Sequence, residues 1–312
     1  MPRDASVIPF PPPNLQLREG ALSRGGVDVR WALTRPAAEH GPPVLLLNGR
    51  TECVEKYAEV VAELGARGRP AATLDWRGQG RSGREGRPGV GHVRRYQDYL
   101  DDLDALLAGP FADLPRPFDV IAHSMGGHLA LRWTLANDQQ VRTLALSAPM
   151  LDLRFQGLTR KLGRLGLAAA CLLGLGKATA FKHAHTASDA AAAAWFPTNP
   201  LTYDRPRFDA WTGFLVDHPD LRLDAGDFAW LRATFRSIDA LKRALPDRFP
   251  VPTLFCVGDE ERVVSAAAIR AAADRPNGRL LALERCRHEP LIEDIAVRAA
   301  FWAAWDALAA DG

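Results

Sequence analysis

The segment 118–130, FDVIAHSMGGHLA, constrains the fold of this chain more than any other stretch. It begins with a short apolar run, 118–122, that is typical of a buried strand. The residues after Ser124 have helical spacing and no proline, so we expect a helix to begin directly at this serine. A chain that passes from strand to helix at one residue leaves that side chain on a sharp turn above the edge of the sheet.

Small residues flank Ser124, as such a turn requires because the strand and helix backbones nearly touch. The pattern Ala122-His123-Ser124-Met125-Gly126 matches the nucleophile elbow G-x-S-x-G, with alanine in place of the first glycine. The turn also brings the Ser124 hydroxyl to the positive end of the following helix. Ser124 is therefore a candidate nucleophile.

Strands and helices alternate along most of the remaining chain. A hairpin is expected at 20–34, where apolar residues alternate after Gly25-Gly26. Further strands are expected at 44–47, 71–74, 142–146, 253–257 and 280–283, and helices at 54–67, 92–108, 264–274 and 291–309. Continuously apolar strands suit burial on both faces, so we predict an α/β fold with a mostly parallel sheet and helices on both faces.

Residues 150–246 interrupt this alternation and contain no convincing strand. An insertion of this length between two strands predicts a helical cap rather than a loop. We therefore divide the chain into a core, residues 1–149 and 247–312, and a cap, residues 150–246. An apolar cap over a site would accommodate a hydrophobic chain, although its apolar residues can also simply pack on the core.

A serine hydroxyl is a poor nucleophile unless a base takes its proton, and an acid must orient that base. His288 follows the strand expected at 280–283 and precedes the last helix, which suits the chain order serine, acid, histidine. His123 is expected to face away from the elbow. The other histidines fit the role less well: His40 in a surface loop, His92 at the start of a helix, His128 on the helix that follows Ser124, and His183, His185 and His218 in the cap.

The acid is expected at the end of the strand that precedes His288, where Asp259, Glu260 and Glu261 follow Gly258. The turn at Gly258 makes the position three residues later a natural one to face the histidine. We therefore favour Glu261, with Asp259 as the alternative. At least one of the three carboxylates is then only a solvated acidic side chain.

An oxyanion hole needs two backbone N–H groups that point at the developing negative charge. The N–H of Met125, directly after Ser124, is one candidate. The second is expected from the loop after strand 44–47, which reads NGRTE from Asn48 to Glu52, and we assign it to Arg50. The alternative is an ordinary turn between a strand and a helix.

Taken together, these motifs resemble the α/β-hydrolase fold, and within it the bacterial lysophospholipase and monoacylglycerol lipase group. The resemblance covers roughly residues 20–147 and 250–310 and includes the string 75–82, DWRGQGRS, a structural loop in capped α/β hydrolases. It implies a serine hydrolase that releases a fatty acid from a single-chain glycerolipid, with no metal or cofactor.

The chain departs from that family pattern at three positions. Asn48 replaces the usual histidine of a His-Gly motif, which should leave the backbone donor intact. Ala122 replaces the first elbow glycine, and Glu261 stands where relatives more often have aspartate. A carboxylate remains in the acid position, so the resemblance still implies activity.

Other functions use the same residues. A short-chain carboxylesterase or a peptidase of this fold would keep the triad and change the substrate, and an acyltransferase would replace water by an alcohol. A non-catalytic binding or scaffold protein would be expected to lack Ser124, the acid or His288. Dehalogenase or epoxide hydrolase chemistry requires a carboxylate nucleophile, which the serine argues against.

The net charge of +2 at pH 7 and the lack of a basic stripe argue against a nucleic-acid partner. The four cysteines are widely spaced, so neither a disulfide framework nor a zinc site is expected. The N-terminal residues, MPRDASVIPFPPPN, have no apolar stretch of the length expected in a signal peptide, and the apolar segment 165–176 is too short to span a bilayer. We therefore expect a soluble, cytoplasmic protein.

Residues 158–182 combine leucines and alanines with arginines and lysines. This composition predicts weak, salt-sensitive contact of the cap with anionic lipid at the inner face of the membrane. An ordinary cap helix with a solvated basic face has the same composition.

Overall fold

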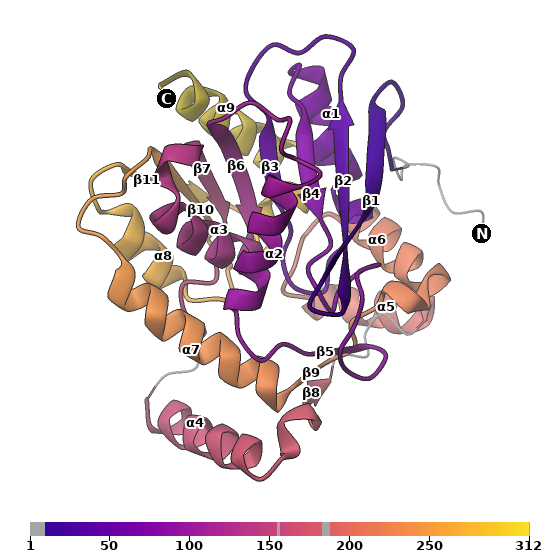
Figure 1. Ribbon diagram of the computed structural model, residues 1–312, viewed down its shortest axis with the longest axis vertical. Helices are drawn as coiled ribbons and strands as arrows, with labels where there is room; N and C mark the ends of the chain where they lie inside the picture. The colour runs from indigo at the N-terminus through magenta and orange to yellow at the C-terminus, as the bar shows by residue number, and fades with distance from the viewer. Residues whose placement is uncertain (1–9, 155–156, 183–187, 312) are drawn as a thin grey trace.

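The computed structural model describes residues 10–154, 157–182 and 188–311 (Figure 1). His183, His185 and residues 1–9 lie outside these ranges. An eight-stranded sheet forms the centre, in the order β1-β2-β4-β3-β6-β7-β10-β11. Its strands are β1 (Gln16–Arg24), β2 (Val27–Arg35), β3 (Val44–Leu47), β4 (Ala71–Leu74), β6 (Phe118–His123), β7 (Val141–Ser147), β10 (Thr253–Gly258) and β11 (Gly278–Leu283). The first two strands form the expected hairpin, and the sheet is parallel from β4 to β11.

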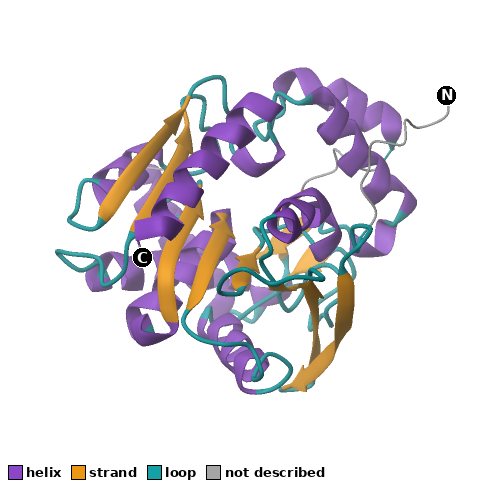
Figure 2. Cartoon of the chain, turned by 90° about the horizontal axis from the view of Figure 1, so that it is seen from above, coloured by secondary structure: helices purple, strands orange, loops and turns teal. Residues whose placement is uncertain are grey.

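Helices cover both faces of the sheet, as predicted (Figure 2). They are α1 (Ala58–Ala66) and α9 (Ile295–Asp311) on one face, and α2 (Gln97–Ala108), α3 (Ser124–Ala136) and α8 (Ala266–Ala273) on the other. All residues of β3, β6 and β10 are buried. This explains their continuous hydrophobicity, because successive side chains enter opposite layers.

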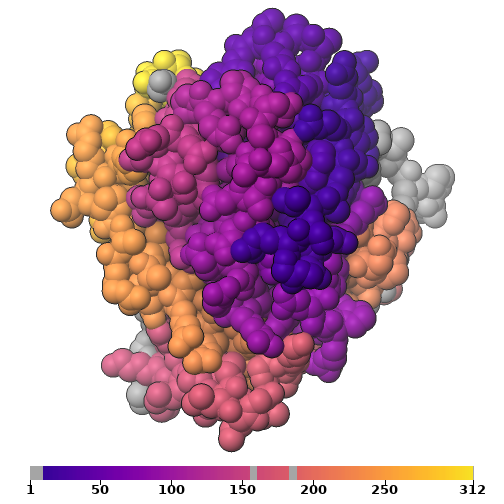
Figure 3. All heavy atoms as spheres, viewed as in Figure 1, coloured from indigo at the N-terminus to yellow at the C-terminus, as the bar shows by residue number. Residues whose placement is uncertain are grey.

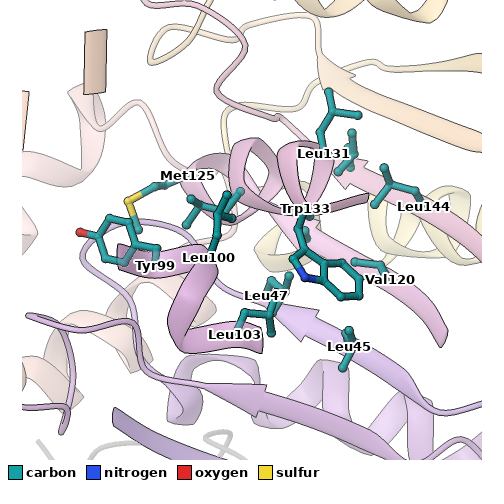
Figure 4. Packing of buried hydrophobic residues seen from close by; sticks show 14 of the residues in the cluster. Leu45, Leu47, Tyr99, Leu100, Leu103, Val120, Met125, Leu131, Trp133 and Leu144 are labelled. Atoms are coloured by element: carbon teal, nitrogen blue, oxygen red, sulfur yellow. The ribbon is translucent and has the colours of Figure 1, made fainter. Parts of the chain in front are cut away.

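Strand β3 illustrates this division of side chains. Val44 and Leu46 pack in the layer with α1 and α9, whereas Leu45 and Leu47 pack in the layer with α2 and α3. In that second layer, Trp133 of α3 lies among Leu45 and Leu47 of β3 and Leu103 of α2 (Figure 4). The apolar side chains of α3 therefore anchor this helix to the sheet.

The segment between β7 and β10, here called the insertion, contains α4 (Gly157–Leu172), α5 (Asp189–Trp195), α6 (Arg205–Asp217) and α7 (Phe228–Ala244). It also contains two short strands, β8 (Thr179–Lys182) and β9 (Ala225–Asp227). They form a second sheet with β5 (Val90–Gly91), in which β9 lies between β5 and β8. The prediction that 150–246 lacks strands is therefore wrong. These strands are too short to show a sequence period, and each is defined by its pairing: β8 with β9, and β9 with β5.

The helix expected at 92–108 begins at Gln97 instead. The preceding residues leave the helical path because Val90 and Gly91 pair with β9. His92 is also held outside the helix, since its Nδ1 lies 2.5 Å from Oδ2 of Asp227. The tertiary contact with the insertion thus shortens α2.

Helix α4 lies at the end of the molecule and packs against α7 (Figure 1). Its arginines face inward, because Arg160 donates to Asp152 at 2.6 Å and Arg164 donates to Asp239 of α7 at 3.0 Å. Its exposed side carries leucines together with Lys161, and the exposed fractions are 59% for Leu162, 68% for Leu165 and 80% for Leu172. None of the helices in the described ranges has the length and apolarity needed to cross a bilayer.

Candidate active site

Ser124 lies on a strained turn between β6 and α3. Its φ angle is +50°, in the left-handed region that residues other than glycine rarely adopt. The turn is tight enough that a Cβ at Gly126 would overlap the carbonyl oxygens of Leu47 and Asn48. The flanking glycine is therefore required by the close approach of β3 to the start of α3.

Three predicted residues meet at the carboxyl ends of the parallel strands. The Ser124 hydroxyl donates to Nε2 of His288 at 3.0 Å, and Nδ1–H of His288 donates to Oε2 of Glu261 at 2.8 Å. The three side chains follow β6, β11 and β10, respectively. Ser124 and His288 are buried, so the hydroxyl and imidazole interact away from bulk water.

The carboxylates at 259–261 have different partners. Oε1 of Glu261 accepts the backbone N–H groups of Val263 at 2.6 Å and Val264 at 3.0 Å, which aims Oε2 at the histidine. Asp259 instead accepts the N–H groups of residues 285 and 286, at 3.2 and 3.1 Å, and so shapes the loop that precedes His288. The structure thus brings Glu261, rather than Asp259, to the imidazole.

Electrostatics favour an ionised acid beside a basic imidazole. Burial by itself lowers the pKa of His288, but the charge and hydrogen bond of Glu261, with the charge of Glu289, raise it above its ordinary value. Burial by itself raises the pKa of Glu261, but the imidazole and the backbone donors lower it below its ordinary value. A negative acid at this position stabilises a protonated His288.

His123 does not face away from the site, contrary to our prediction. Its ring centroid lies 4.8 Å from that of His288, and its Nδ1 lies 3.1 Å from the carbonyl oxygen of Ser147. Because side chains alternate along β6, His123 lies on the same face of the sheet as Ile121. Ile121 packs in the same layer as Cys286, which lies two residues before His288. Burial lowers the pKa of His123 to about 3, so the ring is neutral.

A buried charge cluster behind His288 was not predicted. Lys56 donates to Glu52 at 2.8 Å and to Glu289 at 2.6 Å, while Tyr57 O–H donates to Glu52 at 2.8 Å. Burial by itself raises the pKa of Glu52, but Lys56 lowers it to about 2. The i, i+4 spacing of Glu52 and Lys56 and the glutamate directly after His288 are the only sequence signals of this cluster.

The loop between β3 and α1 is held by side chains on both sides. Asn48 donates to the carbonyl of Leu74 at 3.0 Å, and the Trp76 indole donates to the Asn48 carbonyl at 2.9 Å. The Arg50 side chain is directed toward the insertion, where it donates to the Ala225 carbonyl at 2.8 Å. Arg50 and Met125 are the two candidate donors of the oxyanion hole. Arg50 follows the end of β3, which pairs with β6, and Met125 lies in the first turn of α3, directly after β6.

The string 75–82 supports this loop. Asp75 accepts the N–H of Val54 at 2.8 Å and that of Arg81 at 2.9 Å, and Ser82 donates to the Asp75 carbonyl at 2.6 Å. Its carboxylate is fully buried. These hydrogen bonds, among the described residues, do not involve Ser124 or His288. The segment therefore supports the structure around the site.

Glu52, His123 and Glu289 lie close enough together to share a metal ion. The Lys56 ammonium already lies between the two carboxylates and supplies the positive charge there. A cation would have to displace it. Among the described residues, the arrangement therefore fits a structural ion cluster better than a metal centre.

Comparisons with known proteins agree with this geometry. The family model described as serine aminopeptidase, S33 (Hydrolase_4) matches residues 38–295. Lysophospholipase L2 of Escherichia coli strain K12 is 32% identical over 296 residues, which cover 88% of this chain and 82% of that protein. The probable lysophospholipase L2 of Haemophilus influenzae is 25% identical over 267 residues, and this alignment covers 85% of this chain and 83% of that protein.

A solved structure shares the fold. The soluble variant of monoglyceride lipase from Saccharomyces cerevisiae, in complex with a substrate analogue, has a TM-score of 0.72 and 14% sequence identity. The alignment covers 95% of this chain and 96% of the lipase. The predicted fold class is thus confirmed, and the chain belongs to the serine aminopeptidase S33 (Hydrolase_4) family of α/β hydrolases.

Proposed function

We propose that this α/β hydrolase cleaves carboxylic esters, with Ser124 as nucleophile, His288 as general base and Glu261 as the acid that orients it. The observation that carries the proposal is the continuous hydrogen-bond path from the Ser124 hydroxyl through both ring nitrogens of His288 to Glu261, at 3.0 and 2.8 Å. This is the geometry that activates a serine for acyl transfer.

In the proposed reaction, Nε2 of His288 takes the Ser124 proton as Oγ attacks the ester carbonyl. The backbone N–H groups of Arg50 and Met125 stabilise the oxyanion of the tetrahedral intermediate. The intermediate collapses to an acyl-serine while His288 donates its proton to the leaving alcohol. His288 then takes a proton from water, which attacks the acyl-serine, and the carboxylic acid leaves as the proton returns to Ser124.

The proposed substrate is a lysophospholipid or a monoacylglycerol. Relatives named lysophospholipase L2 and a structural neighbour named monoglyceride lipase support this class. We propose that the insertion, including all of residues 150–246, acts as a cap whose apolar side chains receive the acyl chain. The presence of serine, acid and histidine in contact argues against a non-catalytic scaffold.

We further propose a cytoplasmic protein whose cap touches the inner face of the membrane through α4. The exposed leucines at 162, 165 and 172 support an apolar contact. Arg160 and Arg164 are committed to Asp152 and Asp239, so this contact depends less on salt than the sequence composition suggests.

The deciding experiment combines fluorophosphonate labelling with ester hydrolysis. We expect the probe to label the wild-type protein and not Ser124→Ala, and p-nitrophenyl esters to be cleaved faster as the acyl chain lengthens. Lysophospholipids and monoacylglycerols should then release fatty acid. A preference for acetate esters would indicate a short-chain carboxylesterase, and cleavage of N-terminal peptide bonds alone would indicate a peptidase. A folded protein that the probe does not label would contradict the proposal.

A further inference from the structure

The insertion contacts the backbone of the proposed catalytic base. The N–H of His288 donates to the carbonyl of Pro200 at 3.2 Å, and the next N–H, that of Glu289, donates to the carbonyl of Leu201 at 2.9 Å. Both acceptors lie between α5 and α6 in the insertion. Two successive backbone donors at the histidine are therefore satisfied by the insertion rather than by the core.

Asn199 fixes the shape of the acceptor segment. Its side chain is fully buried, and Oδ1 accepts the N–H groups of Leu201 at 2.8 Å and Thr202 at 3.0 Å. Its Nδ2 donates to the carbonyls of Phe196 at 2.6 Å and Thr202 at 3.2 Å. All the donors and acceptors of the amide are thus used to hold one turn, which orients the carbonyls of residues 200 and 201.

Glu293 holds the same turn from the opposite side. Its carboxylate is fully buried and accepts the N–H of Arg287, directly before the histidine, at 3.0 Å. It also accepts the N–H of Tyr203 in the insertion at 2.9 Å. One carboxylate therefore binds the histidine loop and the insertion together.

Arg287 adds a third connection. Its Nη1 donates to the carbonyl of Thr202 at 3.1 Å, and its guanidinium carbon lies 3.8 Å from the centroid of the Tyr203 ring. A guanidinium over an aromatic ring is attracted to the ring face. The Thr202 hydroxyl also donates to the carbonyl of Ile292 at 3.1 Å. The contacts thus continue on both sides of His288.

We propose that residues 199–203, here called the histidine brace, set the position of the His288 imidazole, and that Asn199 and Glu293 are positioning residues for catalysis. The proposal rests on the proposed function of His288. The histidine lies in a loop between β11 and the last helix, so neither a strand nor a helix fixes its backbone. A displacement of about 1 Å in a catalytic group can cost on the order of 10²-fold in rate. The insertion then contributes to the chemical step as well as to substrate binding.

The test compares Glu293→Leu, which removes the carboxylate, with Glu293→Gln. Oε1 of Glu293 accepts the backbone N–H groups of both Tyr203 and Arg287, and the amide oxygen of glutamine can accept them in its place. Glu63→Leu is the matched control, because Glu63 joins α1 to α9 by accepting from Arg298 and Trp302. The measurements are kcat and KM for p-nitrophenyl acetate and for a long-chain ester, normalised to the fraction of folded protein, and the pH profile of kcat/KM.

We expect Glu293→Leu to lower kcat by about 10²-fold for both esters with little change in KM. The acid limb of the profile should move to lower pH, because a displaced His288 loses the charge of Glu261. Glu293→Gln should recover most of kcat, and Glu63→Leu should change thermal stability alone. Hydrogen exchange of the amides of His288 and Glu289 should be faster in Glu293→Leu.

The proposal would be overturned if folded Glu293→Leu kept the wild-type kcat and the wild-type acid limb of kcat/KM against pH. If that variant does not fold, Asn199→Ala decides the question, because it loosens the same turn and leaves Glu293 in place. The same loss of kcat supports the proposal, and wild-type kcat overturns it. Failure of the proposed function is distinguishable, since the wild-type protein itself would then not cleave the esters.

Discussion

The Lys56 ammonium lies 2.6 Å from the Glu289 carboxylate, so it joins the loop after β3 to the loop that carries His288. It also lies 2.8 Å from Glu52, whose Oε2 accepts the N–H of Gly49 at 2.5 Å. The Lys56 side chain is 2% exposed. A single buried cation thus connects the proposed oxyanion loop with the proposed base.

Replacing Lys56 by methionine should destabilise the fold strongly. The change leaves Glu52 and Glu289 buried beside each other without a counter-ion, which typically costs about 3–5 kcal/mol. Urea unfolding measures the loss. Lys242→Met is the matched control, because Lys242 pairs with Asp152 but remains 44% exposed, and its loss should stay below about 1 kcal/mol. Equal stabilities of the two variants would contradict the role of Lys56.

The pH dependence of activity should follow His288. Burial lowers its pKa, but Glu261 and Glu289 raise it above the ordinary value of 6.5. The base acts in its neutral form, so kcat/KM should fall as the pH falls through a midpoint above that value. A pH profile of kcat/KM measures this limb, and a midpoint below 6.5 would contradict the prediction.

Substitutions of the two candidate acids should distinguish the role of Glu261 from that of Asp259. Glu261→Gln should lower kcat by about 10⁴-fold, since the amide neither holds the imidazole in the same tautomer nor stabilises its charge. Its residual activity should have an acid limb at lower pH. Asp259→Asn loses one of the two oxygens that accept backbone N–H groups in the loop before His288, but it leaves Glu261 in place and should retain most of the activity. The reverse ranking of kcat would assign the acid to Asp259.

Gly126→Ala should disrupt the elbow. The new Cβ would overlap the carbonyl oxygens of Leu47 and Asn48, and such overpacking costs about 1–3 kcal/mol. Gly163→Ala on α4 is the matched control, because a Cβ there meets nothing within 4 Å and the helix should gain up to about 1 kcal/mol. Thermal unfolding compares both variants, and fluorophosphonate labelling reports whether Ser124 remains reactive.

Membrane contact should depend on the outward leucines of α4. The triple variant Leu162→Ser, Leu165→Ser, Leu172→Ser should bind lipid vesicles more weakly than the wild type, because it removes exposed apolar area. Ile295→Ser is the control, since that side chain is 79% exposed on another helix. Co-sedimentation with anionic and with neutral vesicles, at low and high salt, measures binding. Binding that is abolished by salt and unaffected by the leucine changes would favour an electrostatic contact.

The core of the fold could be predicted from the sequence because its signals are local. The continuous hydrophobicity of β3, β6 and β10 follows from burial on both faces, and the small residues around Ser124 follow from one tight turn. These patterns need only a few neighbouring residues. They correctly predicted the hairpin, the parallel sheet and the helix that begins at Ser124.

The short strands β8 and β9 and the start of α2 could not be predicted in this way. Strand β9 pairs with β5 across more than a hundred positions of the chain, and β8 pairs in turn with β9. No periodic pattern accompanies strands of this length. The orientation of His123 was predicted wrongly because the path of the His288 loop over β6 is not a local property.

The sequence by itself determined the elbow at Ser124, the strand-and-helix order, and a short set of candidates for base and acid. Only the tertiary structure selected Glu261 beside His288, placed Lys56 between Glu52 and Glu289, and brought Asn199 and Glu293 to the histidine loop. The physical reason is that propensity and hydrophobic period act over a few residues, whereas the burial and hydrogen-bond partners of a charged side chain are set by segments that meet only in the folded chain.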